Sequence, residues 1–211
     1  PQLATKIEGS YESTFYLGIE SPGAMALAFN FDEFNLTENT KLFIYDEDKS
    51  MHIGSFNSEN NNPSETLSTA VVKGDRMVIE LTIPNNELSD LKLHMSIVTH
   101  DFLDLMNFHG GEPSNRVDCN DNVACSSAND WGDQVDAVVM VSSGGGVCSA
   151  AIINNTAFDL EPYIIYAAHC NGGSSTVYFN YQSNSCSGNN PGNYDTMSGT
   201  QTLAVGNFNS N

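Results

Sequence analysis

The chain has 211 residues, enough to bury a sizeable hydrophobic core in one or two domains. Its 26 acidic and 7 basic residues give a formal net charge of −19. That balance argues against nucleic acid or an anionic membrane as a partner, because both bind basic surfaces. No apolar run approaches the roughly 18 residues of a membrane span.

Residues 1–108 are expected to form a β-sandwich. In "AMALAFNF", Met25, Leu27, Phe29 and Phe31 share one face of a strand, the period of two typical of a half-buried strand. Gly, Pro, Asn and Asp clusters separate this run from four similar ones, at residues 41–47, 51–57, 76–84 and 91–102. Six or seven short strands at this spacing favour a sandwich.

Two polar clusters in this region have weak functional interpretations. His94 and His100 are six residues apart, so a strand would place them on one face, with Asp101 nearby. No third ligand stands at a recognisable spacing, so a solvated sandwich face is preferred over a metal site. Asp46 to Lys49, "DEDK", is interpreted as a charged hairpin turn and not as a calcium loop.

Residues 109–118 are polar, contain Gly and Pro, and are interpreted as a linker. Small residues dominate from residue 119 onward, and a second all-β unit with Gly-rich hairpins is expected over 119–211. Ser142 to Gly146, "SSGGG", lies between two apolar runs and is interpreted as a hairpin turn. The β runs are at residues 135–143, 147–155, 163–170, 175–182 and 202–207.

The run Tyr163 to Cys170, "YIIYAAHC", ends in a histidine followed by a cysteine. For a lone histidine, a hydrogen-bonded side chain at a strand end is the ordinary interpretation, because catalysis needs a partner as well as a base. Two neighbouring alanines allow close backbone packing before His169, and Cys170 can fix the next residue through a disulfide. A general base benefits from such a fixed position.

Gly146 to Cys170 resembles the first half of a chymotrypsin-like serine protease, in which a strand containing CxGxLI precedes one that ends in TAAHC. Three further stretches, "DCNDNVAC", "SAAIINNTA" and "VYFNYQSNSC", are similar to the bacterial lysyl endopeptidase group. This resemblance covers about residues 119–211. The N-terminal sandwich resembles the leader domain of some secreted bacterial precursors. Two positions depart from the pattern: Tyr166 replaces the usual Thr, and Ala150 the usual Gly.

The resemblance implies an all-β fold, a leader sandwich followed by the first barrel of a trypsin-like protease. It implies that His169 is the general base for a serine nucleophile and that a buried aspartate orients the imidazole. No Gly-Asp-Ser-Gly turn and no strand like "SDF" occurs in the sequence. We therefore expect a secreted endopeptidase precursor, truncated before its Asp and Ser and inactive as this chain alone. A protein or peptide is the implied substrate, and the leader is expected to pack on the protease domain.

The five cysteines all lie between Cys119 and Cys186, and none forms a CxxC pair, so neither a structural zinc site nor another cofactor is expected. The resemblance implies the disulfides Cys148–Cys170 and Cys125–Cys186. Cys119 would then have no partner within the chain, as truncation predicts. The alternative is that Cys119 is simply free or pairs between chains.

All seven basic residues lie within residues 1–116, and none follows Val117. Chance and an acidic composition are one explanation. The functional explanation is that a protease cutting after basic residues avoids cutting its own mature domain. Cleavage between Arg116 and Val117, in the polar linker, is then the predicted maturation step. The competing hypothesis for the whole chain is a non-catalytic secreted β protein whose second unit is a relic or a binding module.

Overall fold

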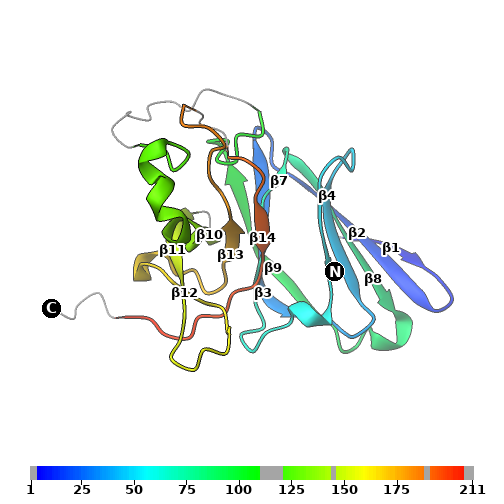
Figure 1. The fold of residues 1–211 in the computed structure, drawn as a ribbon. Coiled ribbons are helices and arrows are strands. Elements are labelled where there is room, and N and C mark those ends of the chain that lie inside the picture. The colour runs from blue at the N-terminus through cyan, green and yellow to red at the C-terminus, as the bar shows by residue number, and fades with distance from the viewer. Residues whose placement is uncertain (1–3, 110–120, 144–145, 188–190, 207–211) are drawn as a thin grey trace.

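The computed structural model describes residues 4–109, 121–143, 146–187 and 191–206 and consists mostly of antiparallel β-strands (Figure 1). The all-β class expected from the sequence is confirmed. Residues 4–109, here called the N-terminal unit, form two sheets. Residues 121–206, the C-terminal unit, form a third sheet within their described parts. No helix in the described part of the chain is long and apolar enough to span a membrane.

The first sheet of the N-terminal unit has the strand order β1-β2-β8-β4-β5, with every neighbour antiparallel. The second sheet is built on β3, which pairs with β9 and, at two separate places, with the short strands β6 and β7. In chain order the strands are β1 Thr5–Glu8, β2 Glu12–Glu20, β3 Ala26–Asn35, β4 Lys41–Asp46, β5 His52–Phe56, β6 Leu67–Ser68, β7 Val72–Lys73, β8 Arg76–Pro84 and β9 Lys92–Asp101. Two 3₁₀ turns, η1 Ser58–Asn60 and η2 Asn85–Glu87, connect them.

The core of the N-terminal unit lies between these two sheets. Period-two patterning produces it: along β8, each inward residue from Met77 to Ile83 is buried and each alternate residue is partly open. On β3, Leu27, Phe29 and Phe31 are buried in the same core, as predicted, whereas Met25 precedes the strand and is exposed. The interlocking of both inner faces is the arrangement of a β-sandwich.

The charged turn "DEDK" is confirmed as a hairpin between β4 and β5. Asp46 organises it from the end of β4, since its carboxylate accepts a hydrogen bond from the Met51 backbone N–H at 3.0 Å. The Asp46 carbonyl also accepts the Lys49 N–H at 3.0 Å. The carboxylate therefore holds the turn closed, which needs no bound ion.

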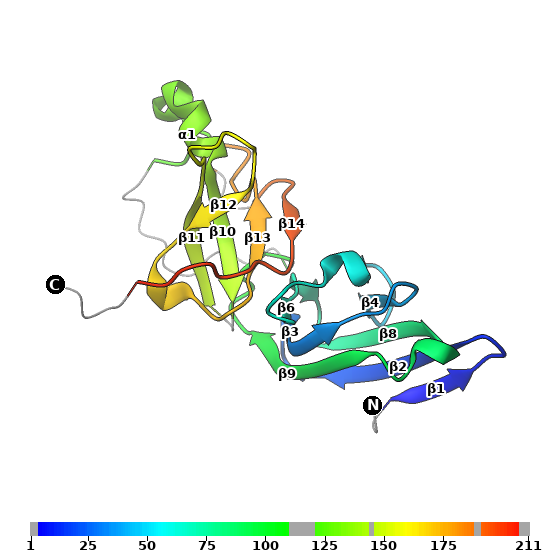
Figure 2. The ribbon, with the colours of Figure 1, turned by 90° about the horizontal axis from the view of Figure 1, so that it is seen from below.

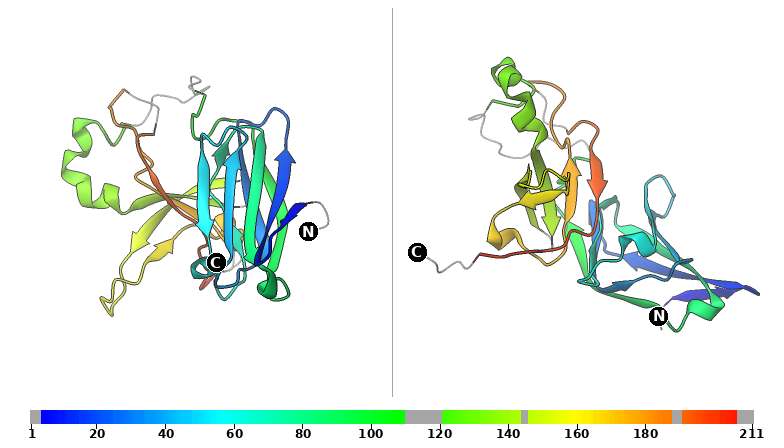
Figure 3. Two further views of the ribbon diagram at one scale, coloured as in Figure 1. Left: turned by 90° about the vertical axis from the view of Figure 1, so that its right-hand side faces the viewer. Right: turned by 60° about the horizontal axis from the view of Figure 1, so that its bottom comes forward.

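The C-terminal unit contains one sheet of order β12-β11-β10-β13-β14, again antiparallel. Before it, a short helical region of η3 and α1 projects away from the N-terminal unit (Figure 3). The pairing of Ser143 with Gly146 joins β10 and β11 as a hairpin, as the sequence predicted. The elements are η3 Ser126–Trp131, α1 Gly132–Asp136, β10 Val138–Ser143, β11 Gly146–Ile153, β12 Tyr163–Ile165, η4 Ala168–Cys170, β13 Thr176–Phe179 and β14 Asp195–Met197.

Two strand predictions in this unit were wrong. The run 163–170 is a strand only to Ile165, and its last three residues form the 3₁₀ turn η4. Residues 202–206, the described part of the last predicted run, contain no strand. The edge strand is instead β14, whose residues are exposed and mostly polar and so carry no apolar alternation.

The two units contact each other directly where β13 runs beside the segment 67–73 (Figure 2). Ser68 donates from its hydroxyl to the Ser174 carbonyl at 2.8 Å, and its backbone N–H donates to the Ser174 hydroxyl at 3.1 Å. Thr176 donates to the Ser68 carbonyl at 2.9 Å. The Val71 N–H donates to the Tyr178 hydroxyl at 3.2 Å. These hydrogen bonds are buried, so the contact is part of the folded core.

A second core fills the space between the units and explains an unexpected feature of β3. Ala26 and Ala28 lie on the face of β3 opposite the sandwich core, yet both are buried. They belong to a cluster with Met106 and the fully buried Tyr178 of β13. From Ala26 to Phe29 both faces of β3 are thus covered, one by the sandwich and the other by the C-terminal unit.

Candidate functional site

His169 lies in the middle of η4 and is exposed to solvent. Two backbone hydrogen bonds close this turn: Cys170 N–H donates to the Ala167 carbonyl at 2.9 Å, and Asn171 N–H to the Ala168 carbonyl at 3.2 Å. The small side chains of the two alanines let β12 turn sharply into η4. The sequence suggested that His169 lies at the end of a strand. The imidazole instead lies on a short turn that these hydrogen bonds hold in place.

A disulfide fastens the histidine turn to an interior strand of the sheet. Cys170 is bonded to Cys148 on β11, 22 residues earlier, with Cα atoms 6.3 Å apart. Cys148 pairs in turn with Val141 of β10, which is fully buried. A cross-link to a strand that is paired on both sides restricts how far the turn that carries His169 can move.

The imidazole and the two sulfur atoms of this disulfide lie within 4.8 Å of one another. In the described residues this is the single cluster of three or more metal-type ligands. Because both sulfurs are consumed in the Cys148–Cys170 bond, neither is a thiolate, and zinc needs thiolates as sulfur ligands. The cluster is thus a disulfide beside an imidazole.

The segment after β14 clamps the loop that follows the histidine turn. The Thr202 hydroxyl lies 3.0 Å from both the Asn171 side-chain oxygen and the Gly173 carbonyl. Two residues earlier, the Thr200 hydroxyl accepts the Ser175 N–H at 2.9 Å, and the Thr200 N–H donates to the Ser175 carbonyl at 3.2 Å. These contacts hold the loop from both of its ends. No local sequence signal identified the two threonines, because their partners lie about 25 to 31 residues away.

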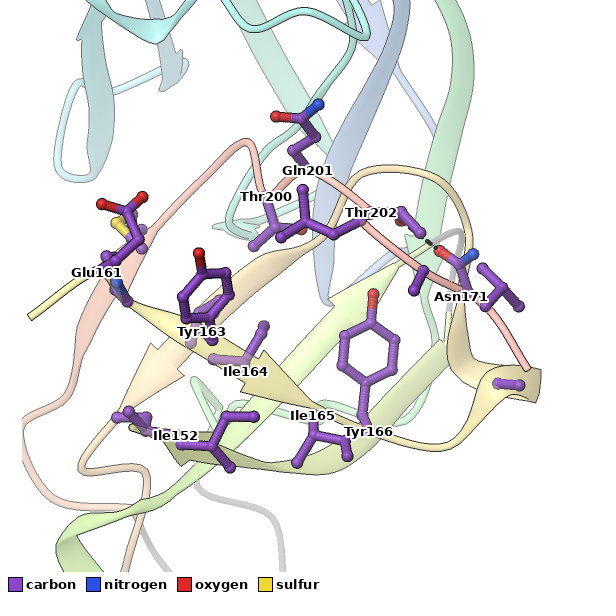
Figure 4. A pocket seen from close by; sticks show the side chains of 18 of the residues that line it. Ile152, Glu161, Tyr163, Ile164, Ile165, Tyr166, Asn171, Thr200, Gln201 and Thr202 are labelled. Atoms are coloured by element: carbon purple, nitrogen blue, oxygen red, sulfur yellow. Dashed lines mark hydrogen bonds between the residues drawn. The ribbon is translucent and has the colours of Figure 1, made fainter. Parts of the chain in front are cut away.

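A groove of about 510 Å³ separates β12 from this clamping segment (Figure 4). The rings of Tyr163 on β12 and of Tyr166, just after it, rise toward residues 200–202, and Ala168 of the histidine turn forms part of the wall. Aliphatic side chains such as Ile152 and Ile164 form the floor. The histidine turn therefore borders a mostly apolar groove of a size that accommodates side chains of a bound molecule.

The second disulfide joins Cys125 to Cys186, with a Cα separation of 4.4 Å. It ties the start of η3 to the chain that follows β13, across 61 residues. Both disulfides implied by the resemblance are therefore present. Arg116, Val117 and Cys119 lie outside the described residues.

The histidines of β9 are both exposed, and each has its own partner. His94 Nδ1 lies 2.6 Å from the Asp32 carboxylate, whereas His100 Nδ1 lies 2.8 Å from the Ser21 hydroxyl. Asp101 is buried and accepts the backbone N–H groups of Leu103 and Leu105 at 2.8 and 2.9 Å. Its carboxylate organises the turn that follows β9.

The fold and the site together define a disulfide-bonded, all-β protein with a solvent-facing histidine on a cross-linked turn. Two disulfides are typical of exported proteins. Residues 114–210 match the family model described as "Lysyl endopeptidase, C-terminal domain". The match supports a relationship of this part of the chain to a lysyl endopeptidase-like family of proteases. No solved structure gave a significant match.

Proposed function

We propose that the protein is a secreted serine endopeptidase precursor in which His169 is the general base. The observation that carries this proposal is the histidine turn itself, with an exposed imidazole cross-linked through Cys170 to the sheet. A misplacement of about 1 Å can cost a catalytic group roughly a hundredfold in rate, so fixing the turn is valuable to a base. The similarity of residues 114–210 to lysyl endopeptidases supports the same assignment.

In this proposal the imidazole takes the proton of a serine hydroxyl as the oxygen attacks the peptide carbonyl, and then gives the proton to the leaving amine. An aspartate orients the ring and stabilises the imidazolium. Because the sequence contains no Gly-Asp-Ser-Gly turn, the proposal assigns the serine and the aspartate to residues outside it. Residues 1–211 alone are then expected to show no triad-dependent peptidase activity.

The test uses the protein produced from its complete natural reading frame. Substrates with Lys, Arg or Leu before the scissile bond are compared, together with labelling by a serine-directed fluorophosphonate. His169→Ala is expected to lower kcat/KM at least about a thousandfold and to abolish labelling. His52→Ala changes an exposed histidine of β5 and serves as the matched control. Full activity in His169→Ala would overturn the proposal.

The second part of the proposal is that the enzyme prefers a basic residue before the scissile bond and matures by cleavage of Arg116–Val117. The structure supplies an argument for selectivity. Protease sites need locally extended, accessible backbone, which paired strands and tight turns do not offer. Six of the seven basic residues lie in such structure, five in strands and one in the β4–β5 turn: Lys6, Lys41, Lys49, Lys73, Arg76 and Lys92.

N-terminal sequencing of the matured protein tests this step. The expected start is Val117, and Arg116→Ala is expected to block or strongly slow maturation. Lys49→Ala, which removes a basic residue from the β4–β5 turn, is the control and should mature normally. A start far from Val117, or normal maturation of Arg116→Ala, contradicts this part of the proposal without affecting the role of His169.

A non-catalytic binding protein is the competing function, and one site residue favours it. Tyr166 stands where the resembled proteases usually have Thr, three residues before His169, and its ring occupies part of the groove wall. Ala150, in place of the usual Gly, is buried in the small core of the sheet. Absence of fluorophosphonate labelling in the wild-type full-length protein would favour this alternative.

A further inference from the structure

The contact between the two units has the properties of a permanent interface. Every polar group that crosses it at Ser68 and Thr176 is buried, and so is the Tyr178 ring. Separating the units would exchange these hydrogen bonds for bonds to water, so each contributes a modest net free energy to the contact. The interface is therefore favoured by complementary polar groups as well as by apolar area.

Tyr178 is the centre of this interface. Its ring is fully buried against alanines of β3 and against Ala70, while its hydroxyl accepts the Val71 N–H. Burial raises the pKa of its phenol, because the phenolate would be desolvated. On the C-terminal unit alone, the aromatic face of β13 would be open to water. A buried aromatic anchor surrounded by satisfied polar groups is the usual centre of a stable interface.

A second connection lies at the end of the N-terminal unit. The Tyr181 hydroxyl donates to the Leu105 carbonyl at 2.6 Å, and Met106 next to it is buried in the inter-unit cluster. The turn that carries Leu105 and Met106 is organised by Asp101 of β9. The interface thus spans three separate segments of the N-terminal unit, residues 26–28 of β3, 67–73 and 101–109.

This interface is independent of any covalent link other than the connecting chain. All five cysteines lie from residue 119 onward, so no disulfide can join the two units. It also leaves His169 exposed. Ser174, which receives two of the hydrogen bonds from Ser68, belongs to the same loop that Thr200 and Thr202 clamp behind the histidine turn.

We propose that the N-terminal unit remains bound to the C-terminal unit as a non-covalent complex after the chain between them is cut. The surface it binds is the face of β13 centred on Tyr178, with the loop 171–175 at its border. The partner for this surface is the chain's own N-terminal unit, and cleavage alone does not release it. The argument rests on the contacts and not on catalytic activity, so it stands or falls separately from the proposed protease function.

The experiment cuts the folded 211-residue chain with trypsin at Arg116, the one basic residue of the connecting segment 110–120, and verifies a single break by mass spectrometry. Size-exclusion chromatography at micromolar concentration follows. The two fragments are expected to elute together at the position of the 22.8 kDa uncut chain and to separate in denaturant. Separate elution of folded wild-type fragments without denaturant overturns the proposal.

Isosteric variants test whether the described interface holds the complex. Tyr178→Phe with Thr176→Val removes two hydroxyls at the interface and should weaken the complex about tenfold or more, measured as the dissociation constant of the cut chain. Tyr11→Phe with Thr196→Val removes two exposed hydroxyls and is the matched control. Equal dissociation constants for the two double variants would show that another surface holds the fragments and would overturn the assignment.

A disruptive variant provides an independent check. Val71→Asp places a charge in the inter-unit cluster, whereas Val98→Asp places the same charge at a partly exposed position of β9 outside that cluster. The cut Val71→Asp chain should elute as two fragments, and the cut Val98→Asp chain as one. Circular dichroism of each uncut variant shows whether the sandwich is folded. A folded Val71→Asp chain whose fragments still elute together contradicts the proposal.

Discussion

The N-terminal and C-terminal units are both antiparallel β structures, but they are stabilised by different means. The sandwich contains no cysteine and closes a core of large side chains between two sheets, among them Phe29, Phe34 and Leu42. In the described residues of the C-terminal unit, the separate core is limited to Val139, Val141, Ala150 and Val177, with partly buried neighbours. A single sheet cannot cover both its faces, so two disulfides and the N-terminal unit complete the stabilisation.

The largest difference in stability between the two units is expected when the two disulfides are reduced. By the chain-entropy model, loops of 22 and 61 residues contribute about 3 and about 4 kcal/mol. Loss of both should unfold the C-terminal sheet and leave the sandwich folded. Amide hydrogen exchange, followed by mass spectrometry, should accelerate in β10 and β11 but not in β8 after a thiol reductant is added.

Fluorescence of Trp131, the one tryptophan of the chain, should report the same unfolding of the C-terminal unit. Trp131 is the last residue of η3, the turn that begins directly after Cys125. Cys119→Ala is the control, since it removes the fifth cysteine and leaves both disulfides. Equal acceleration of exchange in both units would show that they unfold as one cooperative body, and the comparison would fail.

The next effect is a cavity in the sandwich. Phe34 is fully buried between the sheets, so Phe34→Ala should lower the free energy of unfolding by about 3–5 kcal/mol, from lost transfer energy and an unfilled cavity. Urea unfolding monitored by circular dichroism measures it. Phe102→Ala, at a ring that is mostly exposed, should change stability by less than about 0.5 kcal/mol. A small effect at Phe34 would mean that the sandwich core is not the main stabilising element of its unit.

The smallest effect concerns one phenol of the sandwich. Burial, and then the Glu80 carboxylate to which the hydroxyl donates at 2.8 Å, raise the pKa of Tyr45 to about 12. The fold favours the neutral phenol, so this contribution is complete below the unfolded pKa near 10 and is lost as the pH rises through about 12. The phenolate absorbance should show one fewer late-titrating phenol in Tyr45→Phe than in the wild type, while the other buried phenols, Tyr178 and Tyr194, still titrate late.

At neutral pH, Tyr45→Phe should lower the free energy of unfolding by only about 1 kcal/mol, the net contribution of a typical hydrogen bond. Tyr11→Phe, at an exposed ring, is the control and should leave the late titration step of Tyr45 in place. An unchanged late titration in Tyr45→Phe would contradict the raised pKa of Tyr45 and its cause, burial beside Glu80.

The local sequence pattern predicted the sandwich well, because the period-two spacing of apolar residues in each strand shows which of its faces is buried. Leu27, Phe29 and Phe31 illustrate this, since their spacing in the sequence is enough to place them in one core. The opposite face of β3 could not be predicted in this way. Burial of Ala28 depends on Tyr178, 150 residues further along the chain, and no local window contains both.

The candidate site shows the same division. His169 and the cysteines were identified from motif and resemblance, and the structure contains both implied disulfides. The sequence did not indicate that the strand before His169 ends at Ile165, because an apolar run continues through two alanines into the turn. Edge strand β14 and the threonine clamp were missed as well, since short polar segments have no periodicity to detect.

The burial of both faces of β3 from Ala26 to Phe29 has a consequence for how this stretch of the gene can vary. A strand with one solvent-exposed face tolerates polar residues at every second position, so tolerance to substitution alternates along it. Between Ala26 and Phe29 no position faces water. A saturation library scored for folded protein should therefore show an unbroken intolerant block there, with small residues required at Ala26 and Ala28 and large ones at Leu27 and Phe29. Along β8, where the outward residues are partly open, tolerance should return at every second codon.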